Sequence, residues 1–226
     1  MTGGTPSARP DGSDPSRVAL IGAGALGRDS VSVFHALQQQ DPAWRIVGFL
    51  DDREDLWGSE FLGVHVLGGG DWLKTAPDDV EVLLTVGSPE TRRELDERLT
   101  GRVKWARIIH PTAVLTPWVH VDEGVLVMAR ATFTVDVRLG RHVVVNPGCT
   151  VAHDVVVGDY SYLSPGVDLA GRVVLEEGVY MGTGAVAIPG VRIGAGATIG
   201  AGAVVIGDVP PGVTAVGVPA RALDRP

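Results

Sequence analysis

The second half of the chain repeats every six residues. Counted in sixes from Ile109 to Val205, seventeen consecutive positions are all apolar. With hydrophobic residues at 45% overall, this would arise by chance roughly once in a million sequences. A period of six fits neither an α-helix nor an alternating strand, and it predicts a coil with three flat faces, each made of one short strand and one turn. We therefore expect a stack of between five and six coils over residues 109–226. The repeat positions are Ile109, Leu115, Val121, Val127, Phe133, Leu139, Val145, Val151, Val157, Leu163, Leu169, Leu175, Met181, Ala187, Ile193, Ile199 and Val205.

Residues 17–108 follow a different pattern, in which short apolar runs alternate with helical stretches. Strands that alternate with helices predict a parallel, doubly wound sheet, so we expect a Rossmann-like α/β domain here. The expected strands are 17–21, 46–50, 64–67 and 80–86, and the expected helices are 28–40 and 89–99.

Charge and composition exclude several classes of function. The 226-residue chain has a net charge of −8, whereas nucleic-acid binding needs a basic surface, so we expect no nucleic-acid partner. No run approaches the roughly 20 apolar residues that cross a membrane, so we expect no membrane insertion. Residues 1–16 lack the apolar stretch of a signal peptide, so we interpret them as a solvated tail and expect a cytoplasmic protein.

Cysteine and histidine usage argues against a metal centre. Cys149 is the single cysteine, which excludes an internal disulfide and any site built from several cysteines. It lies four residues after a repeat position, in a series of small residues, so we expect it to be buried in packing. No pair or cluster of histidines has ligand spacing, and we expect no metal.

A glycine-rich turn lies between the first expected strand and the first expected helix. Gly22, Gly24 and Gly27 form the pattern GxGxxG, which lets a phosphate approach backbone N–H groups. Asp51 and Asp52 follow the next strand, where a carboxylate can bind a ribose or a base. The motif alone suggests NAD, but residues 17–108 are too few for both halves of a dinucleotide domain. Half a fold suits one nucleotide, and a purely structural turn is the alternative.

The ordered set of motifs resembles one family. It includes Gly22-Ala-Gly-Ala-Leu-Gly27, Ile109-His-Pro111, Val151-Ala-His-Asp154, Ala170-Gly171 and Gly217-Val-Pro-Ala-Arg221 together with the repeat. These residues are similar to those of the NeuD/PglD group of sugar O- and N-acetyltransferases, within the hexapeptide-repeat acyltransferases. The resemblance implies a left-handed parallel β-helix, acetyl-CoA as co-substrate, a nucleotide-linked sugar as acceptor and a homotrimer with grooves between subunits.

His153 and Asp154 are the candidate catalytic pair. Histidine has a suitable pKa for proton transfer at neutral pH, and an adjacent carboxylate can fix its tautomer. An isolated His-Asp pair is more often an ordinary surface pair, but the resemblance assigns catalysis to these two residues. It also implies that the Gly171 N–H faces the thioester carbonyl and that Asn146 binds substrate. A turn glycine at a corner of the coil is the alternative for Gly171, and a stacked ladder of polar side chains is the alternative for Asn146. Tyr162 stands where better-known members of the family have a second histidine. The identity of the acetyl acceptor therefore stays open.

The remaining candidates concern the acetyl donor. We expect Gly171, Thr183, Ala201 and Arg192 to bind acetyl-CoA, because small side chains would let its pantetheine arm lie close to the backbone and an arginine could meet its phosphates. The sequence therefore predicts acetyl transfer to the amino group of a nucleotide-linked amino sugar. A free sugar or another small acceptor, acetylated on nitrogen or oxygen, is the alternative. A non-enzymatic scaffold with a nucleotide sensor is a third hypothesis.

Overall fold

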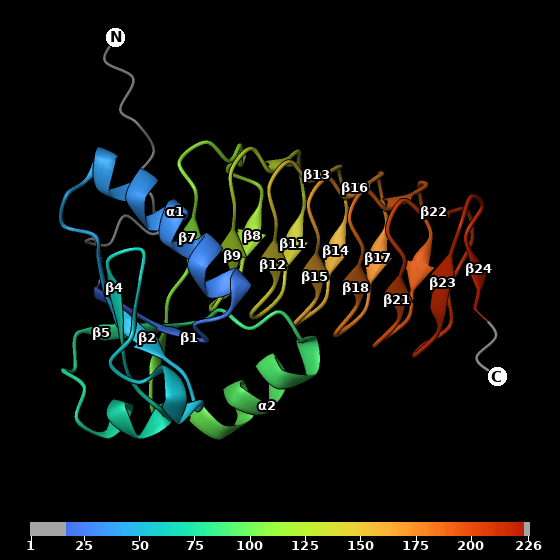
Figure 1. Ribbon diagram of the computed structural model, residues 1–226. Helices are drawn as coiled ribbons and strands as arrows, with labels where there is room; N and C mark the ends of the chain where they lie inside the picture. Colours follow the sequence, from blue (N-terminus) through green and yellow to red (C-terminus); the bar gives the residue numbers. More distant parts are fainter. Residues whose placement is uncertain (1–16, 224–226) are drawn as a thin grey trace, which may run out of the picture.

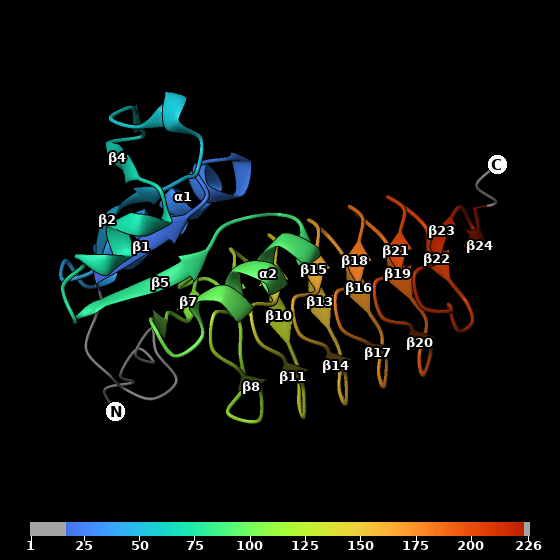
Figure 2. The ribbon, with the colours of Figure 1, turned by 90° about the horizontal axis from the view of Figure 1, so that it is seen from below.

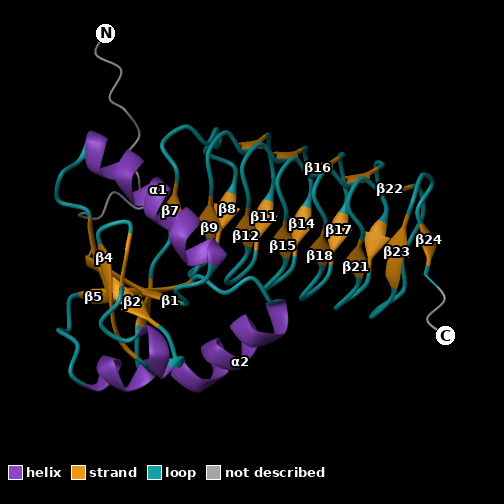
Figure 3. Ribbon diagram, viewed as in Figure 1, coloured by secondary structure: helices purple, strands orange, loops and turns teal. Residues whose placement is uncertain are grey.

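The computed structural model describes residues 17–223, and the predicted tail of residues 1–16 lies outside the described residues. Figure 1 shows two parts: an α/β unit at the N-terminal end and a long stack of coils that carries the chain to its C-terminal end. Helices occur in the α/β unit, whereas the stack is built from short strands and turns (Figure 3).

The α/β unit holds a six-stranded sheet in the order β3-β4-β2-β1-β5-β6. All neighbouring pairs are parallel except β3 and β4, which form a short antiparallel ribbon. Because β1 lies between β2 and β5, the strand order reverses beside it, and the loops after these three strands meet at one edge. The elements are β1 (Arg17–Ile21), α1 (Ala25–Gln40), β2 (Arg45–Leu50), η1 (Glu54–Leu56), β3 (Glu60–Phe61), β4 (Val64–Gly68), η2 (Gly70–Lys74), β5 (Val80–Leu84), α2 (Pro89–Leu99) and β6 (Lys104–Trp105).

The two helices cover opposite faces of this sheet. Val33, Phe34 and Leu37 of α1 are buried against one face, in a cluster that includes Leu20. Leu95 and Leu99 of α2 are buried in a separate cluster on the other face. The helices therefore follow the doubly wound pattern that alternating strands and helices predict.

Helix boundaries follow from local chemistry. The Ser88 hydroxyl accepts a hydrogen bond from the Thr91 N–H at 3.1 Å, and Pro89 occupies the first turn, so α2 starts where the sequence predicts. Helix α1 begins at Ala25, three residues before the predicted start at Arg28. The prediction relied on apolar spacing, which does not register the first helical turn after the glycine-rich loop.

The stack is a parallel β-helix in which each strand pairs in register with the strands one coil before and one coil after it. Thr132 pairs with Thr150, and Thr150 pairs with Asp168, so equivalent residues stand 18 positions apart. Fifteen of the seventeen repeat positions are buried, and the exceptions are Ile109 and Leu115 in the first coil, which has no coil before it. The strands are β7 (Ile108–Ile109), β8 (His120–Val121), β9 (Leu126–Val127), β10 (Thr132–Phe133), β11 (Arg138–Leu139), β12 (Val144–Val145), β13 (Thr150–Val151), β14 (Val156–Val157), β15 (Tyr162–Leu163), β16 (Asp168–Leu169), β17 (Val174–Leu175), β18 (Tyr180–Met181), β19 (Val186–Ala187), β20 (Arg192–Ile193), β21 (Thr198–Ile199) and β22 (Val204–Val205).

Three sheets form the three faces of the prism. We call them the β12 face, the β13 face and the β14 face, after the strands that one coil contributes to each. The β12 face is the longest, because β23 (Thr214–Val216) continues it and β24 (Arg221–Ala222) turns back along its edge. This antiparallel hairpin occupies the C-terminal end of the stack in both views (Figures 1 and 2).

The β12 face also joins the two parts of the molecule. Leu126 and Val144 point away from the coil interior, yet they are 0% and 1% exposed. They belong to the same apolar cluster as Phe34 of α1, so α1 is packed between its own sheet and the first coils. This shared core fixes the α/β unit against one face of the β-helix.

Candidate active site

His153 and Asp154 form a hydrogen-bonded pair at a corner of the β-helix. They follow β13, where the chain turns from the β13 face to the β14 face. His153 Nδ1 lies 2.8 Å from Asp154 Oδ2, and the two side chains are 50% and 53% exposed. When Nδ1–H donates this hydrogen bond to the carboxylate, the neutral imidazole keeps its lone pair on Nε2. The pair therefore presents a base at the surface of the coil.

Gly171 lies beside this imidazole, one coil further along the chain. A Cβ at this position would stand 2.5 Å from both Cε1 and Nε2 of His153, so no other residue fits unless the ring moves. Among the described residues, the Gly171 N–H has no hydrogen-bond acceptor. A base and an unused N–H donor thus share one corner, which is the combination that acyl transfer requires.

Other predicted residues occupy a different corner. Asn146, Thr183 and Ala201 each follow a strand of the β12 face, so they share the corner between the β12 and β13 faces. His153 and Gly171 occupy the next corner. Within one chain, the structure therefore distributes the predicted acetyl-CoA and substrate residues over separate edges of the prism.

Asn146 is buried beside the junction with the α/β unit. Its Nδ2 donates a hydrogen bond to the Leu163 carbonyl at 2.8 Å, and the residue is 4% exposed. It borders a cavity of about 270 Å³ that Asp29 of α1 and His110 also line. Asn146 therefore borders a cavity between α1 and the first coils.

Tyr162 and Arg192 lie on two further surfaces. Tyr162 stacks on Tyr180, with ring centroids 5.2 Å apart, and the Arg92 guanidinium lies 5.6 Å from the Tyr162 ring. Burial raises the pKa of Tyr162, so its hydroxyl stays protonated and can donate a hydrogen bond. Arg192 is in β20 on the β14 face, where it donates to Glu176 at 2.9 Å.

The three glycines of the N-terminal turn have different environments. Gly22 has φ +109, and a Cβ on Gly27 would stand 2.0 Å from the Gly22 carbonyl oxygen, so these two glycines are required by the fold. A Cβ on Gly24 would meet nothing within 4 Å. Gly24 is also the N-cap of α1 and makes no side-chain cap hydrogen bond, which leaves an open approach to the helix N-terminus.

Asp51 and Asp52 lie beside this turn and face different neighbours. Asp51 Oδ2 accepts a hydrogen bond from the Ala23 N–H at 2.9 Å, which ties the end of β2 to the glycine-rich turn. Burial alone would raise the pKa of Asp51, but hydrogen bonds from Arg53 and Ala23 outweigh it and hold the pKa below its usual value. Asp52 Oδ1 accepts instead from the Gly70 N–H at 3.3 Å.

Two family models match the chain. The model of the PglD N-terminal domain covers residues 17–99, and the model of the bacterial transferase hexapeptide (six repeats) covers residues 136–168. No curated protein sequence matches significantly.

Solved structures provide closer comparisons. PerB from Caulobacter crescentus, in complex with CoA and GDP-perosamine, has a TM-score of 0.84 and 32% identity, over 92% of this chain and 98% of PerB. The chain belongs to the PglD-like sugar acetyltransferases of the hexapeptide-repeat superfamily. The acetyltransferase domain of PglB from Neisseria gonorrhoeae, in complex with acetyl coenzyme A, has a TM-score of 0.86 and 32% identity, over 93% of this chain and 100% of that domain. WeeI from Acinetobacter baumannii has a TM-score of 0.83 and 30% identity, over 92% and 100%. The predicted fold class, a Rossmann-like half-domain followed by a left-handed parallel β-helix, is confirmed.

In this PglD-like acetyltransferase, a buried arginine connects the loop after β5 to the coil. Arg92 of α2 is 0% exposed, and its guanidinium donates to the carbonyls of Val86 and Gly87 at 2.8 and 2.9 Å. It also donates to the carbonyls of His142, at 3.2 Å, and of Tyr160. Burial lowers the pKa of Arg92 to about 10, which still leaves it charged at neutral pH. One side chain thus binds the loop after β5 and two successive coils.

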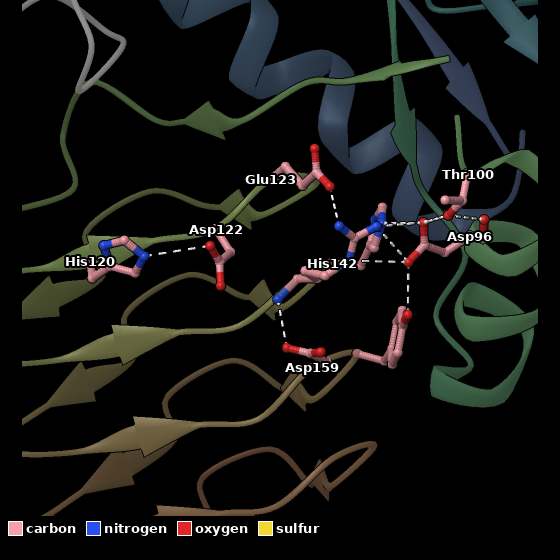
Figure 4. A network of polar contacts seen from close by, with 9 residues as sticks. Asp96, Thr100, His120, Asp122, Glu123, His142 and Asp159 are labelled. Atoms are coloured by element: carbon pink, nitrogen blue, oxygen red, sulfur yellow. Dashed lines mark hydrogen bonds and ion pairs between the residues drawn. The ribbon is translucent and has the colours of Figure 1, made fainter. Parts of the chain in front are cut away.

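One helical turn further along α2, Asp96 anchors a second set of contacts (Figure 4). Its carboxylate pairs with Arg141 at 2.8 Å, accepts from the Tyr160 hydroxyl at 2.7 Å and lies 3.2 Å from His142 Nε2. Burial alone would raise the pKa of Asp96, but the hydrogen bonds from Tyr160 and Arg141 hold it below its usual value. Burial lowers the pKa of His142 to about 4, so this histidine is neutral.

Sequence reasoning did not single out Arg92, Asp96 or His142 as an interaction network. Their partners are about 50 to 70 residues away in the chain, and the only local signal was the spacing of Arg92 and Asp96 on one face of α2. Cys149 is buried as predicted, and burial raises the pKa of its thiol to about 11. Within residues 17–223, no group of acidic, histidine and cysteine side chains could hold a metal, and no helix is long and apolar enough to cross a membrane.

Proposed function

We propose that this chain transfers the acetyl group of acetyl-CoA to the amino group of a nucleotide-linked amino sugar. The observation that carries the proposal is the His153–Asp154 pair beside the Gly171 N–H. PerB, bound to CoA and GDP-perosamine, and PglB, bound to acetyl coenzyme A, support the choice of donor and acceptor class.

The proposed reaction uses His153 as a general base. The amine nitrogen attacks the thioester carbonyl carbon, and Nε2 of His153 takes the proton that the nitrogen loses. The tetrahedral intermediate then collapses, the carbon–sulfur bond breaks, and the CoA thiolate leaves and is protonated by the imidazolium. Asp154 holds the tautomer with the lone pair on Nε2 and stabilises the imidazolium between the two steps.

Gly171 supplies the oxyanion donor. Negative charge develops on the carbonyl oxygen during attack, and a preorganised N–H directed at that oxygen stabilises the transition state. The Gly171 N–H is without an acceptor among the described residues and lies at the same corner as the imidazole. Because Gly171 has no Cβ, it also leaves room for the imidazole ring of His153.

The two parts of the chain divide the work in this proposal. Residues 17–108 bind the nucleotide end of the acceptor through the open turn at Gly24 and through Asp51 and Asp52. Residues 109–226 bind acetyl-CoA and carry out the transfer. Asn146 and Tyr162 bind the sugar, since Asn146 borders the cavity between α1 and the coil.

We propose a homotrimer that completes the site. The predicted acetyl-CoA residues Thr183 and Ala201 lie at a different corner from His153 and Gly171 in one chain. A neighbouring copy can bring its own corner to the first, which creates a groove where a single prism has a convex edge. Arg192 then binds the phosphates of CoA.

We also propose that the enzyme is located in the cytoplasm.

The test is thiol release from acetyl-CoA by the full chain, with a panel of amino-sugar nucleotides and the matching free amino sugars. We expect release with a nucleotide-linked amino sugar, and mass spectrometry should find one acetyl group on its nitrogen. Release that is equally fast with free sugars would favour the free-acceptor alternative. No release with any acceptor, together with tight nucleotide binding, would favour a non-enzymatic sensor.

A further inference from the structure

A cavity of about 580 Å³ lies beside the end of β2, in the part of the α/β unit that α2 covers. Its walls come from the loop after β2, from η2 and from the C-terminal part of α2. Leu73, Leu99 and Val103 give it an apolar side, whereas Asp52, Trp57 and Arg98 place polar and aromatic groups along it. Further charged side chains on its rim are Glu54, Asp71, Lys74 and Arg102. An apolar wall with a few converging polar groups is typical of a small-molecule site.

Three of these groups converge at one point. A Cβ on Gly69 would lie 3.2 Å from Asp52 Oδ1 and 3.4 Å from Trp57 Cζ2, so the carboxylate and the indole are neighbours across a glycine. Arg98 Nη2 lies 3.9 Å from Asp52 Oδ2. Trp57 is 48% exposed, and its Nε1–H donates to the Asp51 carbonyl at 2.8 Å, which orients the ring. The indole therefore has a fixed orientation and about half of its surface exposed, beside a carboxylate and a guanidinium.

The cavity is connected to the glycine-rich turn through two adjacent carboxylates. Asp51 accepts from the Ala23 N–H in the turn, while its neighbour Asp52 lines the cavity. A nucleotide that ran from the Gly24 opening along this edge would pass Asp51 first, with its ribose there and its base toward Asp52 and Trp57. This follows the direction of nucleotides in related α/β folds, across the carboxyl ends of the strands.

We propose that this cavity binds the nucleobase of the acceptor and selects guanine. The inference rests on the proposed function, since it assigns the base of the same nucleotide-linked sugar. The base stacks on Trp57, its ring N1–H and exocyclic N2–H donate to the Asp52 carboxylate, and its O6 accepts from Arg98. Trp57 and Arg98 thereby become nucleotide-binding residues.

The preference for guanine follows from the donor pattern of its edge. Guanine presents two adjacent N–H donors, which a carboxylate accepts in a bidentate manner, next to a carbonyl oxygen that a guanidinium can bind. Uracil and thymine offer one ring N–H between two carbonyl oxygens, and one of these would face the carboxylate. Adenine and cytosine place an unprotonated ring nitrogen beside their amino group. The Asp52 and Arg98 side chains are 74% and 54% exposed, and a bound base would cover them. An edge of the wrong pattern would then leave a polar group without a partner, which lowers the affinity for the other bases.

Binding of GDP, UDP, dTDP and ADP to the full-length protein tests the proposal, by calorimetry and by quenching of tryptophan fluorescence. We expect GDP to bind at least about tenfold more tightly than the other three. Asp52→Asn should remove this preference, because an amide cannot accept both N–H groups. Asp71→Asn is the matched control, since Asp71 lines the same cavity but pairs with Lys74 at 2.7 Å, and it should leave the preference intact.

Trp57→Leu tests the stacking separately. We expect it to weaken binding of all four nucleotides by about tenfold to hundredfold and to abolish the fluorescence quenching. Trp118→Leu is the control, because Trp118 is 63% exposed on the coil, and it should change neither. Equal affinity for all four nucleotides, a GDP preference that persists in Asp52→Asn, or full affinity in Trp57→Leu would overturn the proposal.

These results are independent of the acetyl-transfer assay. If the protein acetylates a nucleotide-linked sugar but shows no GDP preference, the guanine assignment is wrong and the proposed function stands. If it binds GDP selectively but releases no thiol with any amino-sugar acceptor, the cavity assignment stands and the proposed function is wrong.

Discussion

The imidazole of His153 packs against the α-carbon of Gly171 in the following coil. A Cβ on Gly171 would lie 2.5 Å from His153 Nε2, the atom that is free to act as a base. The in-register pairing of β13 with β16 brings the two residues together, so the geometry is set by the backbone of the β-helix. Base and oxyanion donor are therefore held at a fixed separation before any substrate binds.

We predict that Gly171→Ala lowers turnover about hundredfold, because the new methyl displaces the ring and a displacement of about 1 Å can cost that much. The coil should remain folded, with an unchanged circular dichroism spectrum. Gly207→Ala is the matched control, since Gly207 occupies the same corner two coils later and a Cβ there meets nothing within 4 Å. Full activity in Gly171→Ala would contradict the proposed role of this corner.

The glycine-rich turn yields a prediction with opposite outcomes at two glycines. Gly24→Val should raise the dissociation constant for nucleotide about tenfold or more, with little change in Tm, because its side chain enters open space where a phosphate approaches. Gly27→Ala should instead lower the free energy of unfolding by about 1–3 kcal/mol, because its Cβ overlaps the Gly22 carbonyl. Calorimetry and thermal unfolding measure both, and unchanged nucleotide affinity in Gly24→Val would refute the phosphate site.

The buried His142 predicts loss of stability in acid. Its pKa is about 4 in the folded protein and near 6.5 when unfolded, so the unfolded chain binds more protons between these values. Stability is therefore lost as pH falls from about 6.5 to about 4, by up to about 3 kcal/mol at 1.4 kcal/mol per pKa unit. Asp96, whose pKa is lowered, acts in the same direction as pH falls further.

Denaturant unfolding across this pH range measures the effect. His142→Phe keeps an aromatic ring between Trp105 and Tyr160 and removes the titrating group, so the pH dependence should become flatter. His120→Phe is the control, because His120 is exposed on the coil, and it should leave the slope as in the unchanged protein. An identical slope in His142→Phe would show that another group dominates.

The repeat predicted the β-helix in detail because each position depends only on its neighbours one coil away. Val127, Val145 and Leu163 stand at one repeat position in successive coils, and all three are buried on the same face. The corner that holds His153 and Gly171 could be predicted for the same reason, since a spacing of 18 residues makes them neighbours.

Contacts between the two parts of the molecule could not be predicted in this way. Arg92 donates to carbonyls 50 and 68 residues away. Every residue has a backbone carbonyl, so the sequence does not indicate which of them accepts a hydrogen bond. Trp57 could not be recognised from the sequence as a binding residue either, because its proposed role depends on the cavity that Gly69 and Arg98 form with it. Such sites arise from the docking of elements and carry no periodic signal.

The most direct test of the account is the rate of thiol release from acetyl-CoA by His153→Ala, with a nucleotide-linked amino sugar as acceptor. We predict a fall of about two to four decades, typical for the loss of a general base, with the molecular mass in light scattering unchanged from that of the original protein. His120→Ala serves as the matched exposed histidine and should retain full turnover. A His153→Ala protein that is as active as the unchanged chain would contradict the central claim.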